Sequence, residues 1–147
     1  MRYFEDLEVG EKKSFGSVKV DKDEIIDFAK KFDPQYFHID EEAAKKSIFG
    51  SLCASGWYTA SITHRMVVEN YFKDLSVLGS PGGDTLRWRK PVFPGDTLSV
   101  ELEVMEKKNH NKYKEIGIAR MRWNTFNQNK EIVMSLVANL LVNKRNN

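Results

Sequence analysis

The period of the apolar residues changes near residue 84, and this change restricts the chain to a small set of folds. Upstream of it, apolar side chains recur at helical spacing over residues 22–32 and cover most faces of residues 55–72, which is typical of a buried helix. Downstream, apolar and polar side chains alternate in residues 98–104, and two further strands are expected over 113–126 and 131–142. Helices followed by strands indicate the α+β class. One long helix wrapped by a curved antiparallel sheet is the simplest way to bury both.

Capping and turn residues predict the remaining boundaries. Asp21, with Glu24 three residues later, has the pattern of a helix start. The Asp33-Pro34 pair ends that helix, because the residue before proline avoids helical backbone angles. In chain order, the other expected elements are a strand over 12–20, a short helix over 41–48 capped by Asp40 and ending at Gly50, a turn at 81–84, a strand over 85–90, and turns at 94–96 and 127–129.

Length and composition exclude several classes of protein. A chain of 147 residues with 41% apolar residues suffices for one core, so we expect a single domain over 1–147. No apolar run is long enough for a membrane helix, and the charged first thirty residues do not fit a signal peptide. A net charge of +2 gives no support for nucleic-acid binding, and three scattered histidines predict no metal site. The single cysteine excludes an internal disulfide, and a cytoplasmic location is the expectation.

One candidate site is the segment from Asp33 to His38. It places a carboxylate and an imidazole five residues apart, in a segment that we expect to be non-helical. An Asp and a His that face one cleft can act as a general acid–base pair. The alternative is structural: Asp33 only stops the helix, and His38 is a partly buried side chain.

A second candidate is the Ser55-Gly56 pair at the start of the long helix. Glycine leaves room for a ligand close to the backbone, and the free N–H groups of a helix start can bind an oxyanion. The alternative is an ordinary helix cap at Ser55.

Together these residues resemble a known family, the MaoC-type dehydratases, which are relatives of the (R)-specific enoyl-CoA hydratases with a single hotdog fold. The resemblance extends from about Tyr3 to Val142, and residues 3–20, 28–57 and 86–98 carry it. The family's motif positions are matched by Asp33, His38, Asp40, Ala44, Phe49 and Gly56. There are two departures: Gln35 replaces an Asn, with the proline moved to position 34, and Ser55 replaces the His before Gly.

The resemblance implies a reversible syn addition of water to a trans-2-enoyl thioester. In that picture, Asp33 and His38 hold one water. Asp33 takes its proton, His38 handles the proton that reaches the α-carbon, and the Gly56 N–H binds the thioester oxygen. The implied substrate-binding residues are Gln35, Ser55, Trp57 and Ser61. Coenzyme A or pantetheine would belong to the substrate, no metal or redox cofactor is implied, and a homodimer is expected, with no nucleic-acid or membrane partner.

Several alternatives stay open from the sequence. A hotdog thioesterase usually has a carboxylate in the central helix, but Glu69 lies more than three turns from Gly56. A MaoC-like module that binds acyl thioesters without catalysis is the other main alternative. Ser61 fits an active-site serine or simple packing equally well. Arg87, Arg89, Lys45 and Lys46 are candidates for contacts with coenzyme A phosphates, or form solvated surfaces. Trp57 and Tyr58 suggest a crowded pocket and a short or unusual acyl group.

Overall fold

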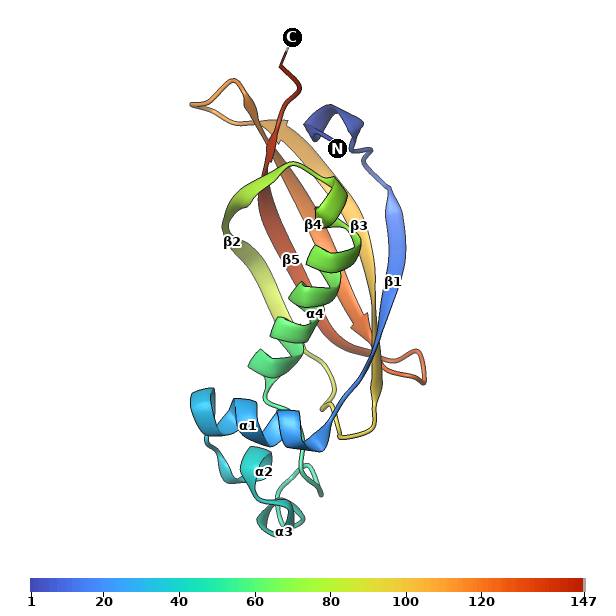
Figure 1. Cartoon of the computed structure of the whole chain (residues 1–147), viewed down its shortest axis with the longest axis vertical. Coiled ribbons are helices and arrows are strands. Elements are labelled where there is room, and N and C mark those ends of the chain that lie inside the picture. Colours follow the sequence, from blue (N-terminus) through green and yellow to red (C-terminus); the bar gives the residue numbers. More distant parts are fainter. Residues whose placement is uncertain (147) are drawn as a thin grey trace.

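Five antiparallel strands curve around one long helix, α4, in the computed structural model, which describes residues 1–146 (Figure 1). The strand order in the sheet is β1-β3-β4-β5-β2. In chain order the elements are η1 (Phe4–Asp6), β1 (Lys12–Lys19), α1 (Lys22–Phe32), α2 (Tyr36–Ile39), α3 (Glu41–Ala44), α4 (Gly56–Asn70), η2 (Phe72–Asp74), β2 (Val77–Trp88), β3 (Thr97–Asn109), β4 (Ile116–Phe126) and β5 (Ile132–Asn143). The predicted α+β arrangement is confirmed.

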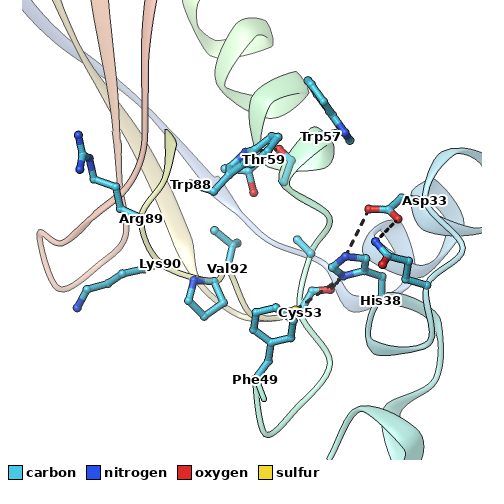
Figure 2. A pocket seen from close by; sticks show the side chains of 14 residues that line it. Asp33, His38, Phe49, Cys53, Trp57, Thr59, Trp88, Arg89, Lys90 and Val92 are labelled. Carbon is cyan, nitrogen blue, oxygen red and sulfur yellow. Dashed lines mark hydrogen bonds and ion pairs between the residues drawn. The ribbon is translucent and has the colours of Figure 1, made fainter. Parts of the chain in front are cut away.

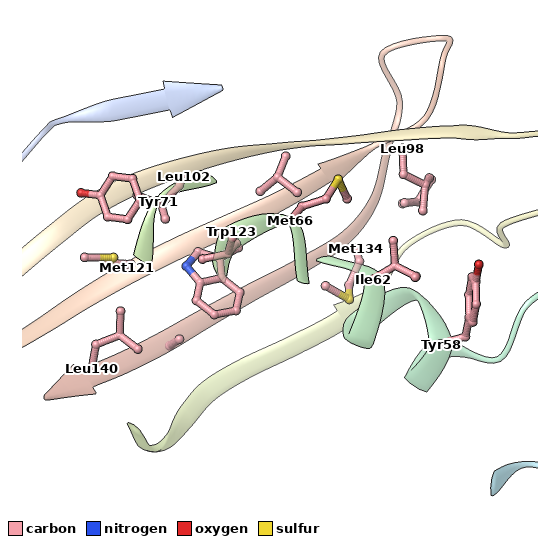
Figure 3. Packing of buried hydrophobic residues seen from close by; sticks show 14 of the residues in the cluster. Tyr58, Ile62, Met66, Tyr71, Leu98, Leu102, Met121, Trp123, Met134 and Leu140 are labelled. Atoms are coloured by element: carbon pink, nitrogen blue, oxygen red, sulfur yellow. The ribbon is translucent and has the colours of Figure 1, made fainter. Parts of the chain in front are cut away.

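The core lies between α4 and the concave face of the sheet (Figure 3). The alternation predicted for β3 is confirmed, because Leu98, Val100, Leu102 and Val104 are all at most 1% exposed. From the helix, Ile62 and Met66 are among the side chains that pack onto this face. Burial of these apolar side chains is the main force that holds the helix in the sheet.

Helix α4 is buried on one side only, which corrects the expectation that it is covered on most sides. Tyr58, Ile62 and Met66 are buried, whereas Trp57 is 56% and Val68 is 40% exposed. The reason is geometric: a single five-stranded sheet covers one side of a helix and leaves the other side, with Trp57 and Val68 on it, open.

Strand β2 is longer than predicted, and the turn expected at 81–84 is wrong. The chain continues as an edge strand through this segment, where Gly82 pairs with Asn139 and Gly83 with Ala138 of β5. A Cβ on Gly83 would lie 2.6 Å from the carbonyl oxygen of Val137, so glycine allows the close approach. A proline is tolerated at an edge because its missing N–H is not needed there.

Three other boundaries differ from the predictions. The second helix, α3, ends at Ala44, although its Asp40 cap is confirmed by a 3.0 Å bond from the Ala43 N–H. Strand β4 starts at Ile116 rather than 113, since the Ile116 N–H closes a turn on the Tyr113 carbonyl. The segment expected to be non-helical contains the single-turn helix α2. Such short elements depend on local turns that a hydrophobic period does not detect.

The small helices gather at the N-terminal end of α4, away from the two chain termini (Figure 1). Helix α1 has the predicted bounds, with Asp21 as its cap, but Glu24 bonds the Tyr58 hydroxyl instead of completing the cap. The opposite end of α4 lies near the N-terminal segment. Within residues 1–146, no helix is both long and apolar enough to cross a membrane.

Candidate active site

Three segments meet at the N-terminus of α4 and border a cavity of about 530 Å³ (Figure 2). They are the end of α1, the short helix α2, and the segment at 53–56 that leads into α4. The end of β2 and the residues after it, up to Val92, close the other side. In Figure 2, Asp33 and His38 lie on the helical side and Arg89 and Lys90 on the opposite side.

Asp33 is held at the end of α1 by two hydrogen bonds to its carboxylate. Ser55 Oγ donates to Oδ2 at 2.7 Å, and Gln35 Nε2 donates to Oδ1 at 2.7 Å. Burial raises the pKa of this carboxyl, but the bonds from Ser55 and Gln35 and the nearby His38 outweigh it, so the pKa lies below its ordinary value. Asp33 is therefore an ionised acceptor near neutral pH.

His38 is buried, with 5% of its surface exposed, and its tautomer follows from its partner. Nδ1 lies 2.7 Å from the carbonyl oxygen of Cys53. A carbonyl can only accept, so Nδ1 carries a proton; when the ring is neutral, Nε2 is therefore an acceptor. Nε2 faces Asp33 Oδ2 at 3.4 Å, which is beyond the usual N–H···O range. With a neutral ring, two acceptor atoms face each other, and a water beside them can donate to both.

Gly56 begins α4, and its N–H donates to no protein acceptor within residues 1–146. The residue lines the cavity. The room expected beside it is partly filled, because the Trp88 indole lies against Gly56 and donates from Nε1 to the Gly56 carbonyl at 2.8 Å. A Cβ on Gly56 would lie only 2.3 Å from Trp88 Cε2. Trp57 meets the same indole edge-on, with ring centroids 5.0 Å apart.

The other predicted binding residues fall in different places. Gln35 and Trp57 line the cavity, whereas Ser55 is fully buried behind it and contacts Asp33. Ser61 lies on a separate groove between α1 and α4, and its hydroxyl donates to the Trp57 carbonyl at 2.8 Å. Tyr58 lines that groove too, so it does not crowd the cavity.

Cys53 lines the cavity, but its thiol is poorly suited to act as a nucleophile. It is 1% exposed, and burial together with the charge of Asp33 raises its pKa to about 11. A thiol with that pKa stays protonated at neutral pH. Within the part of the chain that the structure describes, no three His, Cys, Asp or Glu side chains are grouped to hold a metal ion.

Sequence reasoning missed Trp88, Thr59 and Val92 as lining residues. Trp88 and Val92 lie in the segment at 86–98 that carries part of the family resemblance, and this was the only available signal. They are separated from the start of α4 by more than 30 positions in the sequence, so no local pattern predicts the contact. The cations near the mouth have protein partners: Arg89 donates to Ser135 at 3.1 Å, and Lys90 pairs with Glu131.

Comparisons with known proteins show the family and the fold of the chain. Residues 6–121 match the family model of the MaoC like domain. The chain is 39% identical to the uncharacterized protein YdeM of Bacillus subtilis, over 79% of this chain and 80% of that one. It is 32% identical to a 3-hydroxybutyryl-CoA dehydratase of Methylorubrum extorquens, over 71% of this chain and only 64% of that enzyme. The structure resembles a MaoC-like dehydratase from Rhodospirillum rubrum with a TM-score of 0.89, 36% identity and full coverage of both chains.

Proposed function

This chain belongs to the MaoC-like family and has its hotdog fold, and from that premise we propose that it is a hydro-lyase that adds water reversibly to a trans-2-enoyl thioester. One observation carries the proposal: Asp33 Oδ2 and His38 Nε2, both acceptors when the imidazole is neutral, lie 3.4 Å apart at the edge of a cavity. The named activity of the Methylorubrum extorquens relative, a 3-hydroxybutyryl-CoA dehydratase, is chemistry of this kind.

The acceptor pair supports hydration because it can hold and activate a water. The water donates one hydrogen bond to Asp33 and one to His38. Its oxygen bonds to C3 of the enoyl group, and the π electrons move toward C2. The pair takes one proton from the water and returns it to C2 on the same face, so both groups regain their starting protonation. Acid–base catalysis of this type contributes about 10²–10⁴ in rate.

The Gly56 N–H is the proposed donor to the thioester oxygen. Negative charge develops on that oxygen as water adds to C3, and a donor already aimed at it needs no reorganisation. A donor of this kind is worth about 3 kcal/mol of barrier. The Trp88 indole lies against Gly56 and donates to its carbonyl, so it helps to hold the helix start in place. This scheme uses protein side chains and backbone alone, so we propose no metal or redox cofactor.

We also propose that the carrier is coenzyme A or pantetheine and that the protein works as a homodimer. Arg89 and Lys90, at the side of the cavity opposite Asp33, are suited to the phosphates of such a carrier. Strand β2 is an unpaired sheet edge, and Leu78 on it is 51% exposed. Together with Trp57 and Val68 on the open side of α4, this edge offers unpaired strand groups and exposed apolar side chains to a second copy.

The test follows the loss of the enoyl-thioester absorbance with short-chain and branched enoyl-CoAs. We expect wild-type turnover, and a fall of about 10²–10⁴ in kcat/KM for Asp33→Asn and His38→Ala. Asp27→Asn is the matched control, an exposed carboxylate on the same helix α1. Circular dichroism checks that each variant folds.

Two other outcomes would replace the proposal. Release of free thiol without loss of the double bond would assign the protein to the thioesterases. Tight binding of acyl-CoA with neither reaction would make it a binding module.

A further inference from the structure

Both members of the acceptor pair are held by one short segment, Cys53–Ser55, which precedes α4. The Cys53 carbonyl accepts from His38 Nδ1 at 2.7 Å, and Ser55 Oγ donates to Asp33 Oδ2 at 2.7 Å. The segment is itself fixed on both sides, since the Cys53 N–H donates to the Phe37 carbonyl and the Ala54 N–H donates to the Val92 carbonyl. It is buried throughout. A rigid backbone therefore sets the positions of both side chains.

The hydroxyl of Ser55 has its direction imposed by the helix. Its oxygen accepts the Trp57 N–H at 3.2 Å, which is the capping bond of α4. A hydroxyl has one proton, so with a lone pair committed to that N–H, the proton is free to point at Asp33. Ser55 is 0% exposed and does not line the cavity, so it acts on Asp33 rather than on a ligand.

The oxygen that Ser55 binds is the same one that faces His38. Oδ2 lies 2.7 Å from Ser55 Oγ and 3.4 Å from His38 Nε2. The titratable groups that face this carboxylate are His38, from α2, and the Cys53 thiol, from the segment before α4. The thiol is uncharged near neutral pH, because its pKa is raised to about 11. Ser55 and Gln35 are thus the neutral donors that favour the ionised form of Asp33.

We propose that Ser55 is a positioning residue of the hydration reaction: its hydroxyl holds Asp33 Oδ2 beside His38 and keeps the carboxylate unprotonated. This inference rests on the proposed function and deepens it. Ser55 was expected to bind substrate, whereas in this role it contacts Asp33 instead. Burial raises the pKa of Asp33, but the hydrogen bond from Ser55 is among the interactions that lower it further than burial raises it. The lowered pKa agrees with this role.

The chief test is Ser55→Gly, because glycine caps a helix almost as well as serine but has no hydroxyl. We expect kcat to fall about tenfold or more with KM within about twofold, since the lost bond is to a charged group. Without its donor, the pKa of Asp33 rises, so the acid limb of kcat against pH moves to higher pH. Ser51→Gly, an exposed loop serine nearby, is the matched control. Ser55→Thr retains a hydroxyl and should retain the wild-type acid limb.

A second measurement separates this inference from the proposed function. The carboxyl carbon of Asp33 is titrated by NMR in the wild type and in Ser55→Gly, without any substrate. A higher pKa in the variant supports the role of Ser55. An active wild type with unchanged kcat, pH profile and Asp33 titration in Ser55→Gly overturns that role and leaves the hydratase proposal standing. A folded wild type that turns over no enoyl thioester overturns the proposed function, and with it the positioning role in hydration.

Discussion

The two ends of helix α4 are both polar, but only one has hydrogen-bond acceptors in excess. At the C-terminal end, Arg2 donates to Glu11 at 2.9 Å, and Glu11 also accepts from the Tyr71 hydroxyl at 3.3 Å. These donors and acceptors are paired with one another. At the N-terminal end, Asp33 Oδ2 and His38 Nε2 face each other at 3.4 Å, and both are acceptors when the imidazole is neutral. The C-terminal end of α4 closes the core. The N-terminal end, which borders the cavity and is called the open end below, is suited to a water or a ligand that can donate hydrogen bonds.

This comparison separates stability from chemistry along one helix. Interactions at the C-terminal end of α4 should contribute to the free energy of unfolding and leave catalysis unchanged. The open end should govern catalysis, with a smaller contribution to unfolding, because its polar groups were buried at a cost. Four predictions test this division, from the largest expected effect to the smallest.

Leu102→Ala should destabilise the protein most. Leu102 is 0% exposed and lies near Tyr71 in the core (Figure 3), so its loss leaves a cavity. We expect the free energy of unfolding in urea to fall by about 2–5 kcal/mol, with kcat per folded molecule unchanged. Ile48→Ala, at a fully exposed apolar side chain, is the control and should change it by less than about 0.5 kcal/mol. A parallel loss of kcat in Leu102→Ala would mean that the two ends are coupled.

Gly56→Ala should disturb the open end through Trp88. The new Cβ would lie 2.3 Å from the indole, so the ring or the helix start has to move. We expect a loss of about 1–3 kcal/mol in unfolding free energy, together with a lower kcat as the Gly56 N–H shifts. The double variant with Trp88→Ala should recover part of the stability, which a double-mutant cycle measures. Strictly additive changes in unfolding free energy would show that the side chains at positions 56 and 88 do not interact.

Glu11→Gln should lower stability at neutral pH but not in acid. Burial raises the pKa of Glu11, yet Arg2 outweighs it, so the folded pKa lies below the ordinary value of 4.5. The stabilisation is therefore present above the unfolded pKa and is lost as the pH falls through the folded one. We expect a deficit of about 1 kcal/mol at pH 7, which shrinks as the pH falls below 4.5 and through the folded pKa. A deficit that persists in acid would point to packing and not to charge.

Lys22→Ala should have the smallest effect. Its 3.3 Å ion pair with Glu41 joins α1 to α3, but both side chains are about half exposed. Such surface pairs contribute between 0 and about 1 kcal/mol, so the thermal midpoint should shift by no more than a few degrees. A larger shift would indicate that this pair helps to hold the helices around the open end.

Most of the fold could be predicted because it depends on local periods. The alternation in β3 and the cap of α1 at Asp21 are short-range signals, and both agree with the structure. The errors arose where long-range pairing overrides local preference. Pro81 and its neighbouring glycines read as a turn, but the backbone of β5 continues to pair with that segment. Edge strands tolerate turn-forming residues that an isolated segment would use to reverse direction.

In the candidate site too, some features follow from local sequence and others only from long-range contacts. The five-residue spacing of Asp33 and His38, with the proline between them, determined that a carboxylate and an imidazole lie near one another. The sequence by itself thus determined which groups we propose to react, and the architecture that follows from periodicity, because both are encoded over a few residues. Only the tertiary structure decided that Ser55 donates to Asp33, that the Cys53 carbonyl sets the tautomer of His38, and that Trp88 covers Gly56. Those contacts join residues 15 to 32 positions apart, and such contacts exist only after the chain has packed.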